Sequence, residues 1–222
     1  MIGFGDMITR HLAREKRTKD VGRYYPSEIG GCLRKVWFSY RFPKDVDPEV
    51  IKIFHLGNMI HDFVAEVMKS EKNPEVTLVG EEVPFTIEDG DFTISGRIDD
   101  IVMLEGEDEK ILVEVKSTKM TDILDGPKDE HVMQLQLYMY AMKIFRGIVL
   151  YIEKNTLKTK EFEVKYDQNS VNEVMKRFRA LHANLKAETV PPAEAKENPD
   201  KRWMCKYCDY LEECQRAEID GN

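Results

Sequence analysis

Apolar positions recur along the chain with two different periods. In the longer segments they return every three to four residues, as on one face of a helix. These helical segments cover residues 6–20, 47–70, 128–146 and 168–187, and residues 27–40 suggest a capped turn that leads into a short helix. Shorter segments alternate apolar and polar residues or are apolar throughout, which predicts strands. The expected strands lie near residues 76–87, 92–104, 110–117, 147–153 and 158–165.

Capping and turn residues separate these segments. Asp47 followed by Pro48 is typical of a helix start, and Ser27 is a candidate N-cap for the segment 27–40. Acidic, glycine-containing turns at 88–91 and 105–108 separate the first three strands. The order is helix, three strands, helix, two strands, helix. It predicts an α/β protein with a mixed sheet flanked by helices.

Composition divides the chain into three parts. Residues 1–45 form a basic amino-terminal segment, 46–187 form the α/β core, and 188–222 form a polar, proline-containing linker followed by a group of cysteines. Residues 1–44 hold ten Lys/Arg and four Asp/Glu, whereas the whole chain has a net charge of −8. Such a segment permits nucleic-acid contact, but charge alone favours a solvated basic helix.

The length of the apolar runs indicates where in the cell the protein is expected. They are too short to cross a bilayer, and the first residues lack the continuous apolar stretch of a signal peptide. We therefore expect an intracellular, cytoplasmic protein with no membrane partner.

Four cysteines suggest a metal site. Cys205, Cys208 and Cys214 form a C-x2-C-x5-C pattern, and Cys32 lies 173 positions before the first of them. Stable disulfides are rare in the cytosol, so metal or redox chemistry is favoured. Three thiols in ten residues need one further ligand, and Cys32 is the remaining cysteine. Four thiolates suit either zinc or an iron–sulfur cluster.

A second candidate site lies on the expected strands. Glu114 and Lys116 are two residues apart on one strand and therefore point to the same face. Asp99 lies late on the preceding strand, and pairing of the two strands would bring it close to Glu114. Converging carboxylates repel each other, and a hard divalent cation such as Mg²⁺ or Mn²⁺ relieves that repulsion. The alternative is an ordinary Glu–Lys pair on an exposed sheet face.

Two helices could complete this site. His61 lies on the long helix 47–70 and would add a nitrogen ligand that shifts preference toward Mn²⁺. A lone histidine on a helix is more often a packing residue. Gln134 and Tyr138 share a face of the helix after the E-x-K strand, where the glutamine could hold the lysine. Gln136 and Tyr140 have the same spacing and compete for that role.

Taken together, these residues resemble the PD-(D/E)xK nucleases of the RecB type. The matching pieces are His61, GRID at 96–99, EVK at 114–116 and QLQLY at 134–138. A cysteine before this core and C-x2-C-x5-C after it resemble the iron–sulfur branch of the family, in particular its CRISPR-associated exonucleases. The one departure is Ile98, which stands where the family name has proline.

The resemblance implies a restriction-endonuclease-like mixed sheet and an iron–sulfur module that joins the two ends of the chain. It implies a [4Fe–4S] cluster on Cys32, Cys205, Cys208 and Cys214. It also implies one or two Mn²⁺ or Mg²⁺ ions, with catalytic or metal-binding roles for His61, Asp99, Glu114, the Val115 carbonyl, Lys116, Gln134 and Tyr138. A metal that joins the chain ends would place four basic residues beside the active-site groove, where they could bind DNA. These residues are Arg34, Lys35, Lys201 and Arg202.

The expected activity is metal-dependent exonucleolytic cleavage of DNA, with single-stranded DNA preferred. The implied task is trimming or selecting prespacers together with the CRISPR spacer integrase. Three alternatives stay open. The protein could be a repair or phage exonuclease of the same branch, or a DNA-binding module of an integration complex whose cleavage is incidental. It could also be a non-enzymatic protein stabilised by a bound zinc ion.

Overall fold

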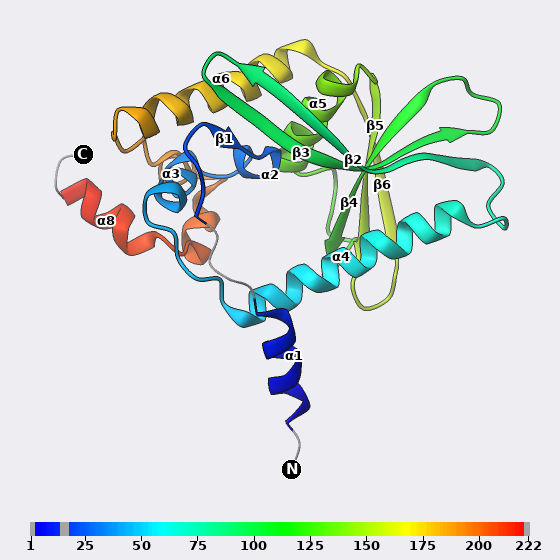
Figure 1. Ribbon diagram of the computed structural model, residues 1–222, viewed down its shortest axis with the longest axis horizontal. Coiled ribbons are helices and arrows are strands. Elements are labelled where there is room, and N and C mark those ends of the chain that lie inside the picture. The colour runs from blue at the N-terminus through cyan, green and yellow to red at the C-terminus, as the bar shows by residue number, and fades with distance from the viewer. Residues whose placement is uncertain (1–2, 14–17, 220–222) are drawn as a thin grey trace.

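One six-stranded sheet organises the computed structural model, which describes residues 3–13 and 18–219 (Figure 1). The strand order is β1-β3-β4-β5-β6. Strand β2 stands outside this order and also pairs with β3. The strands are β1 (Arg23–Tyr24), β2 (Val76–Asp89), β3 (Phe92–Leu104), β4 (Lys110–Thr118), β5 (Arg146–Glu153) and β6 (Thr159–Lys165). Strands β2, β3 and β4 pair antiparallel, and β4 pairs parallel with β5. The mixed sheet and its flanking helices confirm the predicted α/β class.

The helices follow the predicted segments with some differences. They are α1 (Phe4–Leu12), α2 (Pro26–Ile29), α3 (Leu33–Arg41), α4 (Pro48–Lys69), α5 (Asp129–Met142), α6 (Gln168–Lys186), α7 (Glu194–Glu197) and α8 (Leu211–Ile219), with a 3₁₀ turn η1 (Arg202–Tyr207). Asp47 caps α4 as predicted, because its side chain accepts from the Glu49 N–H. No helix in the described ranges is long and apolar enough to span a membrane.

Three expectations were wrong in detail. The segment 27–40 contains the predicted turn and short helix (α3), but a separate helix, α2, precedes the turn, and Ser27 lies inside α2 rather than capping a helix. The segment 188–202 is not a free linker, since it contains α7 and buries Ala195. The short strand β1 and helix α8 have no clear periodic pattern and were missed. Part of the expected helix at 6–20 lies outside the described residues.

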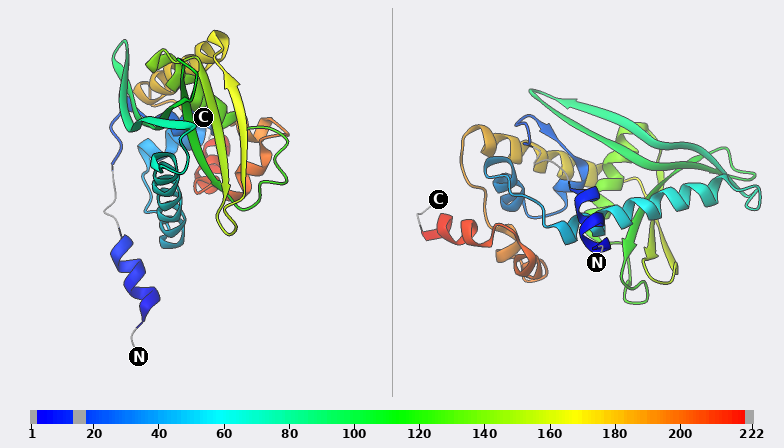
Figure 2. Two further views of the ribbon diagram at one scale, coloured as in Figure 1. Left: turned by 90° about the vertical axis from the view of Figure 1, so that its right-hand side faces the viewer. Right: turned by 60° about the horizontal axis from the view of Figure 1, so that its bottom comes forward.

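Helices cover both faces of the sheet (Figures 1 and 2). On one face, Ile60 and Val64 of α4 pack against Val113 and Val115 of β4. On the other face, Leu135 and Tyr138 of α5 pack against apolar residues of β3 and β4. Helix α6 lies against α5. Strand β4 is therefore apolar on both sides, so the charged pair within it stands in a buried setting.

A third core joins the two ends of the chain. Trp37 and Phe38 of α3 pack with Phe178 and Leu181 of α6. Tyr210, just before α8, stacks on Phe38 with 5.9 Å between ring centroids. Aromatic side chains bury large areas, so this cluster fixes the amino-terminal segment against the carboxyl-terminal one.

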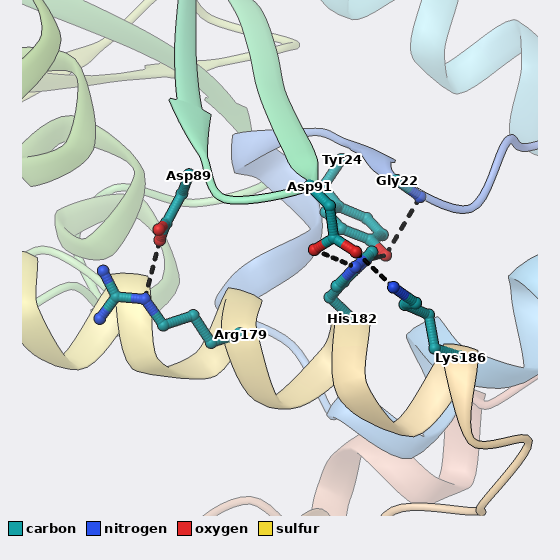
Figure 3. Close-up of polar contacts among 7 residues, drawn as sticks. All are labelled: Gly22, Tyr24, Asp89, Asp91, Arg179, His182 and Lys186. Carbon is teal, nitrogen blue, oxygen red and sulfur yellow. Dashed lines mark hydrogen bonds and ion pairs between the residues drawn. The ribbon is translucent and has the colours of Figure 1, made fainter.

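A polar network fixes the β2–β3 turn to α6 (Figure 3). His182 Nε2 is 2.9 Å from Asp91 Oδ1, and His182 Nδ1 is 2.7 Å from the hydroxyl of Tyr24. Lys186 pairs with the same Asp91 carboxylate. Tyr24 is fully buried, and this burial raises its pKa to about 12. These contacts hold the turn of the β2–β3 hairpin in place, and so help to fix which residues of β2 and β3 lie opposite each other.

Candidate active site

Asp99 and Glu114 stand where β3 and β4 separate. The ladder between the two strands ends at the pair Asp100–Val113, so the next residues, Asp99 and Glu114, face each other across the opening. Asp99 Oδ2 accepts a hydrogen bond of 2.8 Å from the Val115 N–H in place of a ladder bond. Strand separation therefore leaves side chains of both strands room to converge.

Glu114 is a buried acid with unsatisfied oxygens. It is 1% exposed, and neither carboxylate oxygen accepts a hydrogen bond from the described residues. Lys116 Nζ lies 2.5 Å from Glu114 Oε1, so the two side chains form an ion pair on one face of β4. Burial, followed by the negative charge of Asp99, raises the pKa of Glu114. Two carboxylates, those of Asp99 and Glu114, thus lie beside this one lysine, and a divalent cation would balance the remaining negative charge.

Helix α5 holds the lysine in place. Lys116 Nζ donates to Gln134 Oε1 at 3.1 Å, and Gln134 Nε2 donates to the Tyr138 hydroxyl at 2.6 Å. Tyr138 is only 3% exposed, and its hydroxyl contacts Gln134 rather than the molecular surface. Gln136 faces elsewhere and bonds the backbone of Lys165.

Helix α4 supplies His61. Its Nδ1 lies 3.4 Å from Asp99 Oδ1. Burial alone would lower the pKa of His61, but the hydrogen bond and charge of Asp99 outweigh burial and raise it. A Cβ on Gly57, one turn earlier, would lie 3.6 Å from the Ser117 hydroxyl, so α4 passes close to the end of β4.

Glu82 joins this group from β2, and sequence reasoning missed it. Ligand atoms of His61, Glu82 and Asp99 all lie within 4.8 Å of one another. A signal for it exists in the sequence. The turn at 88–91 sets the hairpin pair Asp89–Phe92, and counting back along both strands places Glu82 opposite Asp99.

Asp100 adds a further buried carboxyl next to the site. It is 2% exposed, and burial together with the charge of Asp99 raises its pKa to about 7. Its Oδ1 has no hydrogen-bond partner in the described part of the chain. The acids here outnumber the basic side chains that contact them. An oxygen-rich set with one imidazole and unsatisfied buried carboxylate oxygens fits a divalent cation of the Mg²⁺ or Mn²⁺ type.

A neutral histidine lies beside the lysine. Burial, followed by the charges of Lys116 and Lys128, lowers the pKa of His131 to about 3. Its Nδ1 is 2.7 Å from the hydroxyl of Tyr151, and that hydroxyl accepts from the Lys128 N–H. Because the Tyr151 oxygen accepts a hydrogen bond from the Lys128 N–H, its own hydroxyl proton is available to Nδ1, which accepts it in the neutral imidazole.

The four cysteines line one cavity away from this site. Its volume is about 250 Å³, and Cys32, Cys205, Cys208 and Cys214 all border it. Within residues 3–13 and 18–219, no cysteine belongs to a group of three or more ligand atoms within 4.8 Å of one another. Sulfurs on one tetrahedral zinc would lie about 3.8 Å apart, given a Zn–S distance of about 2.3 Å. The thiols share a cavity but are not arranged as a compact zinc site.

The basic residues expected to grip DNA separate into two kinds. Arg34 is 7% exposed, and its Nε donates to the Pro191 carbonyl at 2.6 Å. A guanidinium buried in this way ties the chain ends together and is not placed for DNA contact. Lys35 is partly exposed and pairs with Asp209 at 3.3 Å. Lys201 and Arg202 lie at the start of η1, where Arg202 is exposed.

The mixed sheet and the Asp99, Glu114 and Lys116 side chains at its parted strands are the features of one nuclease class. Residues 13–215 match the PD-(D/E)XK nuclease superfamily, and the chain belongs to it. The protein is therefore a nuclease, in a superfamily that typically depends on divalent metal ions.

Particular proteins are similar over nearly the whole chain. The CRISPR-associated exonuclease Cas4 of Saccharolobus solfataricus is 24% identical over 222 aligned residues, covering 94% of this chain and 98% of that protein. The crystal structure of SSO0001 superposes with a TM-score of 0.60 at 22% identity, covering 93% of this chain and 91% of that one. LHK-Exo in complex with dAMP gives a TM-score of 0.49 at 14% identity, covering 76% and 90%.

Proposed function

We propose that the protein is a divalent-metal-dependent DNA exonuclease that trims or selects prespacers during CRISPR adaptation. The observation that carries the cleavage chemistry is the Glu114–Lys116 pair, buried beside Asp99 and held by Gln134. The similarity to a CRISPR-associated exonuclease over both full lengths supports the cellular role. Single-stranded DNA is the proposed substrate.

Asp99, Glu114, His61 and the Val115 carbonyl would hold Mn²⁺ or Mg²⁺. When bound, the cation would polarise the phosphate and make a bound water more acidic. Lys116 Nζ stabilises the negative charge that develops on the phosphate as the water oxygen–phosphorus bond forms and the ester bond breaks. Gln134 accepts from Nζ, so it keeps the lysine directed at the reacting group.

We also propose a [4Fe–4S] cluster on Cys32, Cys205, Cys208 and Cys214. Two observations support it: the four thiols border one cavity, and no three of these described cysteines lie within 4.8 Å of one another as on a single zinc ion. A group bound there would link the segment between α2 and α3 to η1 and α8, and its binding would contribute to folding.

The DNA strand would then lie near the cysteine cavity. Lys35 borders this cavity, and Lys201 and Arg202 directly precede Trp203, which also borders it, so these residues would supply positive charge. Exposed Trp203 and Tyr207 would supply faces on which bases can stack. Buried Trp37, by contrast, belongs to the core.

Cleavage of end-labelled DNA tests the proposal. Anaerobically purified protein is mixed with single- or double-stranded DNA in Mn²⁺, Mg²⁺ or EDTA. Metal-dependent shortening by the wild type and by Lys165→Ala, an exposed lysine on β6, but not by Lys116→Ala, supports it. No cleavage by a folded, cluster-loaded protein contradicts it. DNA affinity that selects a sequence and survives Lys116→Ala would then favour a binding module.

A second assay addresses the CRISPR role. The protein is combined with the spacer integrase of its own host and a DNA carrying overhanging ends. Integration of trimmed DNA with the wild type, and of no trimmed DNA with Lys116→Ala, is the expected result. Equal integration of trimmed DNA with both proteins would assign trimming to another enzyme.

A further inference from the structure

Two loops meet at the carboxyl ends of the parallel strands β4 and β5. The register pairs Thr118, the last residue of β4, with Glu153, the last residue of β5. The Lys154 N–H donates to the Thr118 carbonyl at 3.0 Å, so the pairing continues one residue beyond the strands. Lys119 and Lys154, the first residues of the two loops, are therefore held next to each other.

A buried acid fixes the two loops to each other. Glu153 is 7% exposed, and its Oε1 accepts hydrogen bonds from the Thr121 N–H at 2.7 Å and from the Thr121 hydroxyl at 3.0 Å. Its Oε2 accepts from the hydroxyl of Thr156 in the other loop. Because Glu153 bonds to both loops, the backbones that carry the two lysines keep a fixed separation.

The two ammonium groups have no acid between them. Burial, followed by the charge of Lys119, lowers the pKa of Lys154. Among the residues that the structure describes, neither lysine forms an ion pair, and Asp122 of the first loop pairs instead with Lys158 at 3.8 Å. Like charges held side by side cost stability, so the arrangement is better explained by binding of an anion than by a role in the fold.

The lysine pair lies close to the candidate active site. Lys119 follows Lys116 by three residues, which is about 10 Å along a strand. Val115 and Ile152 pack in the core beneath α4. Continuing the alternation of side chains past these two positions directs Lys119 and Lys154 toward the same helix. Helix α4 also supplies a side chain of the active site, so one DNA strand can reach both.

We propose that Lys119 and Lys154 together bind one phosphate group of the DNA strand, other than the phosphate that is cleaved. The assignment rests on the proposed function and adds a substrate contact made by residues that do not border the cysteine cavity. Two ammonium groups supply positive charge and donors to a phosphate, and phosphate contacts carry no sequence information. The pair would therefore position the strand without selecting a base.

The salt dependence of DNA binding tests this assignment. A fluorescent single-stranded DNA is titrated with cluster-loaded protein by anisotropy, at several NaCl concentrations and without added divalent metal. The slope of the logarithm of the binding constant against the logarithm of the salt concentration has a magnitude of about 0.7 for each phosphate neutralised on a single strand. The double variant Lys119→Gln, Lys154→Gln should lower that magnitude by about 0.7 and weaken binding at least about tenfold.

Two control variants separate charge from structure. The double variant Lys119→Arg, Lys154→Arg keeps both charges and should keep the slope. Lys158→Gln changes a neighbouring lysine that already pairs with Asp122, and it should bind DNA as the wild type does. Since the two lysines repel each other, the glutamine double variant should melt at no lower temperature than the wild type. A lower melting temperature would give the pair a structural role and overturn the assignment.

Cleavage kinetics in Mn²⁺ provide a second measurement. The glutamine double variant should show a KM raised at least about tenfold with an unchanged kcat, because the contact is equally strong before and during the reaction. An unchanged salt slope, or one lowered by about 1.4 as for two separate phosphates, would overturn the assignment. The expected slopes with a wild type that does not cleave DNA would refute the nuclease proposal alone, so the two failures are distinguishable.

Discussion

His131 makes the stability of this protein depend on pH in a way that can be calculated. Its pKa is lowered from 6.5 to about 3 in the folded protein, mainly by burial. Between these values the unfolded chain binds a proton that the folded protein does not, so the free energy of unfolding falls as the pH falls. At pH 5 the loss is about 2 kcal/mol, from about 1.5 pH units at 1.36 kcal/mol each.

The perturbation is His131→Asn. The asparagine oxygen can take the place of Nδ1 and accept from the Tyr151 hydroxyl, but it does not titrate. Thermal unfolding is followed by circular dichroism at pH 7.5 and at pH 5. Because 1 kcal/mol corresponds to about 2–4 °C in a chain of this size, the wild type should lose about 4–8 °C more than the variant.

His11→Asn on the exposed helix α1 is the control and should follow the wild type. If His131→Asn and the wild type lose equal stability between the two pH values, then His131 is charged in the folded protein or accessible to water. Either outcome would refute the proton assignment drawn from the Lys128, Tyr151 and His131 contacts.

Three further outcomes are expected. Gly30→Ala should destabilise the protein by about 1–3 kcal/mol or more, because the added Cβ would lie 2.5 Å from the Cα of Glu130, and denaturant unfolding measures it. Tyr24→Phe should cost about 1–2 kcal/mol, since it leaves the buried His182 without its hydroxyl partner, and an unchanged midpoint would contradict Figure 3. Mn²⁺ should raise the melting temperature of the wild type but raise that of Asp99→Ala much less; equal shifts would place the metal elsewhere.

Local pattern was sufficient for most of the fold. The periodicity of α4 and α6, the cap at Asp47 and the turns at 88–91 and 105–108 are properties of neighbouring residues, so the elements they define could be predicted. The close packing of α2 on α5 could not be predicted because its cause is distant: Gly30 meets the backbone of Glu130, a hundred positions later in the chain.

The same division holds for the site. The sequence by itself determined that Glu114 and Lys116 share one face, because that follows from the two-residue period of a strand, and it determined which residue types suit a hard cation. Tertiary structure alone decided that Arg34 is buried and that His61 of α4 meets Asp99 and Glu82. Burial and cross-strand contact depend on how three strands and α4 come together, and the residues involved lie far apart along the chain.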